Sequence, residues 1–496
     1  MAKDNQDLYC SDLTSNSDPT MGKILVTGVT GYIGGRLVPE LLARGYSVRA
    51  MVRTDSPNLE TLWPGVEVVV ADALRPDTLR QAMKDIHTAY YLIHSLLLGP
   101  QQFETADIQA AINFRFAAEK MGISRIIYLG GLGDNNSLLS PHLRSRIQVA
   151  QELQNGSIPV TILRAAIIIG SGSASYEILE NLIRNVPILP IPVWARTRCQ
   201  PIAVRDVIKY LVGSLEVCDT IGNSYDIGGN EILSYEMMLK TLANVLGKKR
   251  VFFPIPFSDI KSYSYLASLV TPVPHHITRC LMESSFNEVV CKDTEIRNLI
   301  PFQPISFREA LVRALSREEQ DRVSTRWSDA YPPAHELAIK LSELKEKPNF
   351  TTEYSLLSAK KTSGLFKSIC MIGGKEGWFN SNWMWKLRGN VDRLLLGVGT
   401  SRGRRSRSSL RINDVIDFWR VEDLRQNKML LLRAEMKLPG KAWLQFDVTP
   451  QGAMNRLSVK AFFQTNSFLG NAYWYFFLPF HHFIFRDLIA QIEKIS

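Results

Sequence analysis

The stretch TGVTGYIG spans Thr27–Gly34 and separates an apolar segment, Lys23–Thr27, from an amphipathic one that runs through Leu41 and Leu42. A strand, a glycine turn and a helix in this order are typical of the first βαβ unit of a dinucleotide-binding domain. The first glycine allows the tight turn, the second lets the backbone approach a pyrophosphate at the helix N-terminus, and the third lets the helix pack close to the strand. The sequence therefore predicts a dinucleotide site formed by Gly28, Thr30, Gly31, Tyr32, Ile33 and Gly34.

The residue that follows the second predicted strand indicates which dinucleotide binds. An acidic side chain there would accept the ribose 2′-hydroxyl of NAD, whereas this chain has Arg53. A guanidinium suits a 2′-phosphate through charge-assisted hydrogen bonds. NADP is therefore favoured, and the nearby Asp55 keeps NAD open as an alternative.

Two further segments are predicted to contact the cofactor. Asp72, with Ala73 beside it, ends the third predicted strand and is placed to reach the adenine amino group; a solvated loop acid is the alternative. Ile93 and His94 end the fourth predicted strand, where the chain passes beneath the nicotinamide ribose in such folds.

Alternating apolar and amphipathic segments predict an α/β Rossmann fold, a doubly wound parallel sheet covered by helices. A looser segment after Ile169 predicts a smaller substrate lobe. The predicted strands are 23–27, 47–52, 66–72, 89–94, 125–131, 160–165 and 224–229, and the predicted helices are 78–84, 103–120, 143–153 and 307–322.

The sequence pattern changes beyond residue 349, where aromatic-rich predicted strands replace the alternation of predicted strands and helices. Predicted strands at 414–423, 428–438, 441–449 and 456–464 precede a helix from about Phe480 to Ile495, which indicates an α+β domain of helix-grip type. Its tryptophans could line an apolar ligand cavity or form a packed core. The predicted organisation is a disordered tail (1–21), a Rossmann domain with its small lobe (22–323), a linker (324–349) and a C-terminal domain (350–496).

Composition supports a multidomain globular protein: 496 residues, 45% hydrophobic and 21% charged. The net charge of +10 is spread along the chain, so nucleic acid is not an expected partner, and the basic cluster Arg402–Arg411 is interpreted as a solvated loop. The apolar run Tyr473–Phe485 is too short to span a bilayer and is interpreted as core. With no apolar leader in residues 1–20 and six scattered cysteines, we expect a cytoplasmic protein without a transmembrane segment, a disulfide framework or a metal site.

The motifs TGVTGYIGG, ADAL (71–74), YYLIHS (90–95), IIYLGGLG (126–133) and QPIAVRDV (200–207) resemble those of atypical, extended short-chain dehydrogenases/reductases, including the NmrA-like members. The segments GGKEGW (373–378), WKLRGNVDRLLLGVG (385–399) and LLRAEMKLPGKAWLQF (431–446) resemble a partner domain of unknown function that looks START-like. The whole chain thus resembles bacterial two-domain proteins of this group.

Active members of that group use a serine after the fifth strand and a Tyr-x-x-x-Lys pair on the next helix. Here the fifth predicted strand ends in Gly130–Gly131, and His142 and Arg146 fall at the Tyr/Lys spacing. His142 could donate a proton near neutral pH while Arg146 reaches the ribose. The alternatives are a helix-start histidine with an exposed arginine, or His94 as the acid.

Three functions remain open: an NADP(H)-dependent oxidoreductase acting on an apolar or carbonyl small molecule, a non-catalytic NADP(H) sensor of the NmrA type, and an assembly or scaffold protein. The first is favoured because the cofactor motif is intact, although the standard Ser/Tyr/Lys set is missing.

Overall fold

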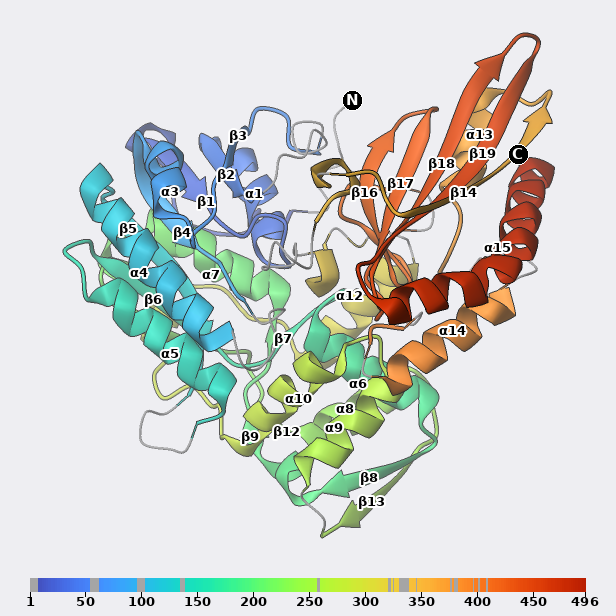
Figure 1. The fold of residues 1–496 in the computed structure, drawn as a ribbon. Helices are drawn as coiled ribbons and strands as arrows, with labels where there is room; N and C mark the ends of the chain where they lie inside the picture. Colours follow the sequence, from blue (N-terminus) through green and yellow to red (C-terminus); the bar gives the residue numbers. More distant parts are fainter. Residues whose placement is uncertain are drawn as a thin grey trace. The chain divides into compact units, whose positions relative to one another are not determined.

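The computed structural model describes residues 8–53, 62–95, 103–133, 139–256, 259–319, 323, 325–329, 339–344, 346–374, 377–378, 382–395, 397–399, 402–406 and 409–496. The chain divides into two compact units (Figure 1). Unit 1 comprises Met1–Val270 and His276–Pro333, and unit 2 comprises Thr271–His275 and Ala334–Ser496.

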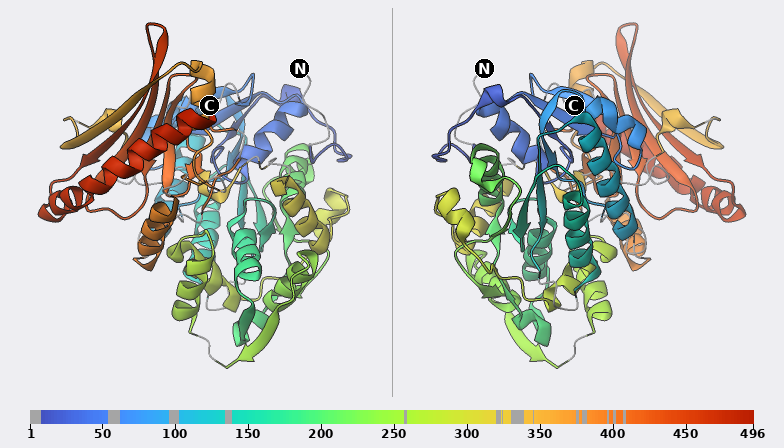
Figure 2. Two further views of the ribbon diagram at one scale, coloured as in Figure 1. Left: turned by 90° about the vertical axis from the view of Figure 1, so that its right-hand side faces the viewer. Right: turned by 90° about the vertical axis from the view of Figure 1, so that its left-hand side faces the viewer.

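A seven-stranded parallel sheet forms the centre of unit 1, in the order β11-β6-β5-β4-β1-β2-β3 (Figure 2). The strand order reverses between β1 and β4, so the carboxyl ends of these two strands flank the switch point at which such sheets bind ligands. Its strands are β1 (Lys23–Val26), β2 (Val48–Val52), β3 (Glu67–Val70), β4 (Ile86–Tyr91), β5 (Arg125–Gly131), β6 (Val160–Ala165) and β11 (Ser224–Ile227).

Helices cover both faces of this sheet and each face has its own apolar core. One core joins the sheet to α1 (Gly34–Ala43) and α7 (Val204–Glu216). The other joins it to α3 (Pro76–Met83), α4 (Phe103–Met121) and α5 (Pro141–Gln154). The predicted doubly wound Rossmann fold is confirmed.

The smaller lobe of unit 1 contains short ladders and helices. Its strands are β7 (Ile168–Ile169), β8 (Ile188–Pro192), β9 (Arg198–Cys199), β10 (Ile202–Ala203), β12 (Leu233–Ser234) and β13 (Val251–Ile255). Its helices are α6 (Ala174–Asn185), α8 (Tyr235–Val245), α9 (Ile260–Val270), α10 (His275–Glu283), α11 (Glu295–Leu299) and α12 (Phe307–Glu319).

Unit 2 is a six-stranded antiparallel sheet with helices, in the order β14-β19-β18-β17-β16-β15. Its core contains Trp378, Trp385 and Trp419. The strands are β14 (Phe350–Ser358), β15 (Val415–Ile416), β16 (Trp419–Arg425), β17 (Met429–Ala434), β18 (Lys441–Gln451) and β19 (Met454–Gln464); the helices are α13 (Thr362–Ile369), α14 (Asn382–Leu394) and α15 (Phe468–Ile495). The predicted sheet and terminal helix are confirmed, and the three buried indoles belong to a packed core.

The prediction of a disordered N-terminal tail is wrong for the described residues 8–21. The backbone N–H groups of Tyr9 and Cys10 donate to Glu40 of α1, and Asp12 pairs with the buried Lys209 of α7 at 2.5 Å. Glu40 and Lys209 bind polar groups of this segment, so the segment packs on unit 1.

The predicted linker also begins too early. Thr325 and Ser328 are buried in unit 1, and the Trp327 indole donates to Glu177 at 2.6 Å. Within the predicted linker, Leu341–Glu343 forms a 3-10 turn. The division between the units falls at Pro333/Ala334.

Two interpretations of unit 2 are corrected by burial. Arg402 and Arg405 are buried and paired with Glu435 at 2.7 Å and Asp414 at 2.8 Å, so the described part of the basic cluster is not a solvated loop. The run Tyr473–Phe485 is not uniformly core, since it belongs to α15, which starts at Phe468 and exposes one face.

Candidate functional site

The glycine turn lies at the carboxyl end of β1, beside β4. The Thr27 hydroxyl donates to the Tyr90 carbonyl and accepts from the Leu92 N–H, both at 2.9 Å, which ties the two strand ends together. Gly28 has φ +64°, a conformation that favours glycine, and a Cβ there would lie 2.5 Å from the Leu92 carbonyl oxygen. A Cβ on Gly34 would lie within 3.0 Å of three backbone atoms of the turn.

This cradle fits a dinucleotide pyrophosphate. The turn is only partly buried, and α1 begins at Gly34 with its backbone N–H groups directed toward the turn. Since side chains at Gly28 and Gly34 would collide with backbone, glycine is required at both. The predicted contacts at Thr30, Gly31, Tyr32 and Ile33 all lie on the partly exposed part of the turn.

Arg36 was missed in the sequence analysis. Its guanidinium is buried, lies 4.1 Å from the centre of the Tyr32 ring, and donates to the carbonyls of Tyr32, Ser171 and Thr325 at 2.8–3.0 Å. A cation in the first turn of a helix opposes the helix dipole. The three carbonyls compensate the buried charge of Arg36 and tie the turn to the segments that hold Ser171 and Thr325.

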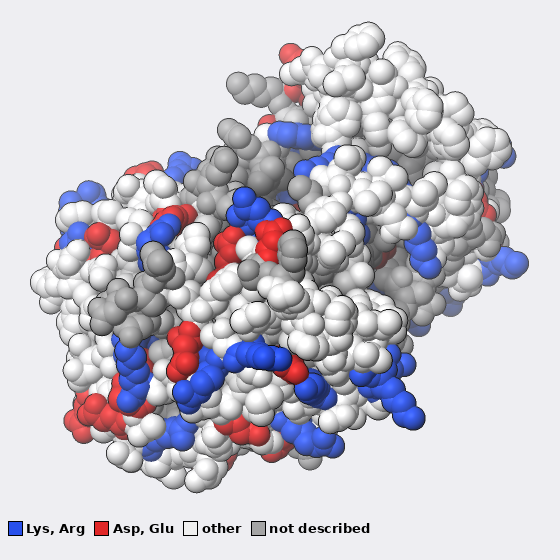
Figure 3. Space-filling view, turned by 90° about the horizontal axis from the view of Figure 1, so that it is seen from below, with Lys and Arg blue, Asp and Glu red and all other residues white. Residues whose placement is uncertain are grey.

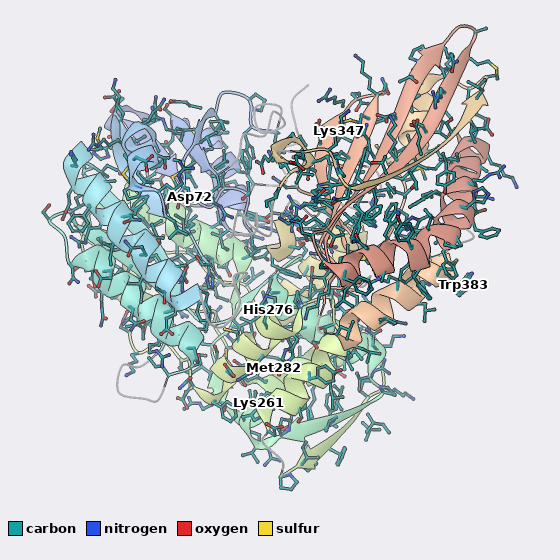
Figure 4. The ribbon with its side chains drawn as sticks, in the orientation of Figure 1. Asp72, Lys261, His276, Met282, Lys347 and Trp383 are labelled. Atoms are coloured by element: carbon teal, nitrogen blue, oxygen red, sulfur yellow. The ribbon has the colours of Figure 1, made fainter. Side chains whose placement is uncertain are left out.

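The residues predicted to select and hold the nucleoside lie at the same sheet edge. Arg53 directly follows β2, whereas Asp55 lies outside the described residues. The Asp72 carboxylate, just after β3 (Figure 4), accepts from the Leu74 N–H at 3.0 Å, and the buried Ala73 accepts from Asn113 of α4. Asp72 therefore shapes its own turn with one of its two carboxylate oxygens.

The segment after β4 differs from the prediction in its boundary. β4 ends at Tyr91, so Ile93 and His94 belong to the following loop rather than to the strand. The strand stops there because the Leu92 N–H bonds to the Thr27 hydroxyl instead of a neighbouring strand. The structure still brings His94 beside α5, where its ring stacks on that of His142 with centroids 5.1 Å apart.

The central element of this region is Asp107 on α4, which the sequence analysis missed. Asp107 is 1% exposed and pairs with the Arg146 guanidinium, whose side chain is 6% exposed. The carboxylate also accepts from the Ser95 N–H at 2.8 Å and the Ser145 hydroxyl at 3.2 Å, and lies 3.5 Å from His94 Nδ1. An acidic residue on a helix gives no signal of such a partner 39 positions away.

Asp107 and Arg146 form a neutralised pair. Burial raises the pKa of Asp107, but the Arg146 charge and the bonds from His94 and Ser95 outweigh it and hold the pKa well below the usual range. Arg146 donates further to the Ile93 carbonyl at 3.3 Å, so it links α5 to α4 and to the loop after β4. The predicted exposed arginine is therefore excluded.

His142 is the second residue of α5, after Pro141, and the Ser140 hydroxyl caps the helix by accepting from the Leu143 N–H. Burial lowers the pKa of His142 well below its usual value, and the charges of His94 and Arg146 add to this. Burial and Arg146 likewise lower the pKa of His94. Both imidazoles are therefore neutral at neutral pH, and His142 Nδ1 is buried without a hydrogen-bond partner among the described residues.

A cavity of about 510 Å³ lies beside α5, and its lining includes Gly130 and Gly131 at the end of β5 and Arg146 of α5. It combines an apolar wall with charged groups, among which Arg164 pairs with the buried Asp226 at 2.7 Å. The apolar lining is Leu132, Ile147, Ala150, Ile162 and Val290, and the charged lining is Arg146, Arg164, Asp226, Glu288 and Lys292.

Known proteins similar to this chain include reductases and an assembly factor. The chain is 24% identical over 250 residues to the photosystem II assembly factor Ycf39 of Trieres chinensis, covering 49% of this chain and 75% of that protein. It is 24% identical over 257 residues to the divinyl chlorophyllide a 8-vinyl-reductase of Cucumis sativus, covering 48% of this chain and 60% of that protein.

A solved structure of Citrobacter sp. triphenylmethane reductase complexed with NADP(H) aligns with 59% of this chain and 99% of its own, at 23% identity and a TM-score of 0.49. Residues 345–488 match the model of a protein family of unknown function, DUF2867. Residues 20–302, more than half of the chain, match the model of the NmrA-like family. The chain therefore belongs to the NmrA-like family.

Proposed function

We propose that this chain is an NADP(H)-dependent oxidoreductase whose substrate is a small molecule with an apolar body and a polar end. The observation that carries the proposal is the 510 Å³ cavity, because its lining includes Gly130 and Gly131 of β5 and Arg146 of α5, the elements that carry the reactive groups in the proteins that this chain resembles. Its mixed apolar and charged lining suits such a substrate better than a purely apolar one.

The cofactor assignment within this proposal is NADP(H). The glycine turn would hold the pyrophosphate, Arg53 the 2′-phosphate, and Asp72 the adenine amino group. Bound NADPH supplies a hydride. NAD remains the alternative cofactor, and the 2′-phosphate contact of Arg53 is the feature that discriminates between them.

The proposed roles of His142 and Arg146 follow from their contacts. His142 lies one turn of α5 before the cavity-lining Arg146, so as a neutral imidazole it would donate a hydrogen bond to a substrate oxygen that extends beyond the cavity lining, but it is not a strong acid. This favours substrates that accept a hydride at a conjugated carbon or a polarised carbonyl. Arg146 acts as a positioning residue, since it fixes Asp107, and through Asp107 the orientation of His94.

The rival proposal is a non-catalytic NADP(H) sensor, and one observation favours it. Arg146 stands where the usual Tyr/Lys pair has its lysine, but its charge is already neutralised by Asp107. It is therefore not available to bind a ribose as that lysine does. In that case the cofactor would bind with similar affinity but no substrate would be reduced.

The test uses the full chain. We expect NADPH to bind more tightly than NADH, and Arg53→Ala to remove most of that difference; equal losses for both cofactors would refute the NADP assignment. Transfer of deuterium from C4-labelled NADPH to a panel of enones, quinones and aldehydes tests catalysis.

The cavity is tested by a matched pair of variants on α5. Ala150→Phe fills the cavity and should abolish deuterium transfer while NADPH still binds; Arg144→Phe places the same side chain on the exposed side of the helix and should keep both. Tight NADPH binding with no transfer to any acceptor would favour the sensor. Transfer that survives in Ala150→Phe would place the substrate elsewhere.

A further inference from the structure

Helix α14 of unit 2 presents an exposed apolar face. Trp383, Leu387, Val391 and Leu394 recur at helical spacing, so they share one side, and all four are exposed; Trp383 is 64% exposed and is labelled in Figure 4. The buried side of the same helix carries Trp385, which packs in the core. The helix therefore has apolar residues on both its inner and its outer side.

Helix α15 repeats this pattern on a larger scale. Its first 18 residues, 468–485, contain no Asp, Glu, Lys or Arg. Trp474 and Phe485 face the core, whereas Phe476 and Phe483 are 67% and 71% exposed. The outer face is formed by Phe468, Leu469, Tyr475, Phe476, Phe480 and Phe483.

The loop at residues 437–439 contacts both helices, so their outer faces belong to one surface region. The Arg388 guanidinium of α14 donates to the Lys437 carbonyl at 2.7 Å. Two residues later, the Pro439 carbonyl accepts from the Thr465 hydroxyl at 2.7 Å and packs against Gly470 in the first turn of α15. Figures 1 and 2 show α14 and α15 on the same side of unit 2.

Basic side chains outnumber acidic ones along the two helices, and the acidic residues of α15, Asp487 and Glu493, follow its charge-free segment. Lys386 of α14 and Lys437 of the joining loop are exposed. Within α14 and residues 468–486 the one acidic residue is Asp392, which is fully buried and accepts from the N–H groups of Gly399 and Lys437 at 2.8 Å. In Figure 3 charged side chains are sparse over the upper right, the side on which α14 and α15 lie in Figure 1.

We propose that the outer faces of α14 and α15 bind the surface of an anionic lipid bilayer. Phenylalanine, tyrosine and tryptophan beside lysine form the composition of helices that lie in the membrane interface. Anionic headgroups supply the negative charge that this surface lacks, whereas a second copy of the chain would bring its own lysines to the contact. The described part of the chain contains no helix with the length and apolar character of a membrane span.

The test measures co-sedimentation of the full chain with vesicles of phosphatidylcholine alone or with 30% phosphatidylglycerol, a composition chosen as roughly that of an anionic membrane. We expect binding to the anionic vesicles that weakens with salt. Phe476→Ser combined with Phe483→Ser should reduce binding roughly tenfold or more, because two exposed aromatic side chains are lost. Lys386→Glu combined with Lys437→Glu should reduce it on anionic vesicles specifically.

Leu357→Ser is the matched control, since Leu357 is an exposed apolar residue of unit 2 on β14, and it should leave binding unchanged. Thermal unfolding and circular dichroism confirm that each variant folds. Three results would overturn the proposal: no sedimentation of the folded wild type at low salt, equal losses for the phenylalanine pair and Leu357→Ser, or a wild-type dimer that the phenylalanine pair converts to monomer without any vesicle binding.

Discussion

Replacing Asp107 by asparagine tests the buried ion pair beside the cavity. Asparagine keeps the size of the side chain and one acceptor oxygen, but it leaves the Arg146 guanidinium buried without a counter-charge. Removing one partner of a buried pair costs about 3–5 kcal/mol. We expect a loss of this size in the free energy that holds α4 and α5 together.

Hydrogen exchange measured by mass spectrometry gives this free energy locally, which is useful because a two-unit chain need not unfold in one step. Peptides from α4 and α5 report the opening. The control is Glu104→Gln, which breaks the pair with Arg144 between the same two helices; these side chains are 29% and 49% exposed, so the loss should be about 0–1 kcal/mol.

The pKa of Asp107 sets the pH range of the effect. Because the folded pKa lies well below the ordinary carboxyl range, the pair stabilises the protein above that range and is lost only as the pH falls through the folded pKa. The difference between wild type and Asp107→Asn should therefore be constant from neutral pH down to about pH 5. Asp107→Asn with Arg146→Met should recover part of the loss; an Asp107→Asn loss no larger than that of Glu104→Gln would refute the reasoning.

Three other predictions concern positions whose surroundings are fixed by backbone or charge. Gly34→Ala should weaken NADPH binding roughly tenfold or more, because the new Cβ meets turn backbone that positions the phosphate; isothermal titration measures it, and Gly364→Ala, where the nearest such atom lies 3.9 Å away, should be neutral. Burial raises the pKa of Asp206 to about 6, so the wild type loses stability as the pH rises and this carboxyl ionises. The free energy of unfolding of Asp206→Asn, relative to that of the wild type, should therefore be roughly 3 kcal/mol higher at pH 7.5 than at pH 4 in urea unfolding. An unchanged difference between the two proteins would contradict the burial argument. Glu435→Gln should lower the free energy of unfolding of unit 2 by about 3 kcal/mol or more, because it removes the carboxylate that pairs with the buried Arg402 and Arg420. An unchanged unfolding midpoint would contradict this.

The fold of unit 1 could be predicted because its strands are continuous apolar runs and its glycine turn stands at a fixed place between strand and helix. The sheet of unit 2 was predicted from alternating aromatic strands, although β14 and helices α13 and α14 were not. The NmrA-like resemblance is confirmed, whereas the START-like resemblance of unit 2 stays a prediction.

Long-range partners account for what the sequence analysis missed. In the sequence Asp107 looks like any acidic residue of a surface helix, because its partner Arg146 is brought to it only by the fold. The run Tyr473–Phe485 was assigned to the core because hydropathy reports how apolar a segment is, but not which of its sides meets the protein. The roles of His142 and of Arg53 stay predictions, since both depend on a bound cofactor.

The contacts of Arg36 have a consequence for synthesis on the ribosome. Its partner Thr325 lies 289 residues further along the chain. At about 5–20 residues per second, the ribosome needs roughly 15–60 s to deliver that partner after Arg36 has been made. During this interval the guanidinium has the Tyr32 and Ser171 carbonyls within reach but lacks the Thr325 carbonyl. The first helix of unit 1 thus obtains one of its contacts only when the far end of unit 1 has been made.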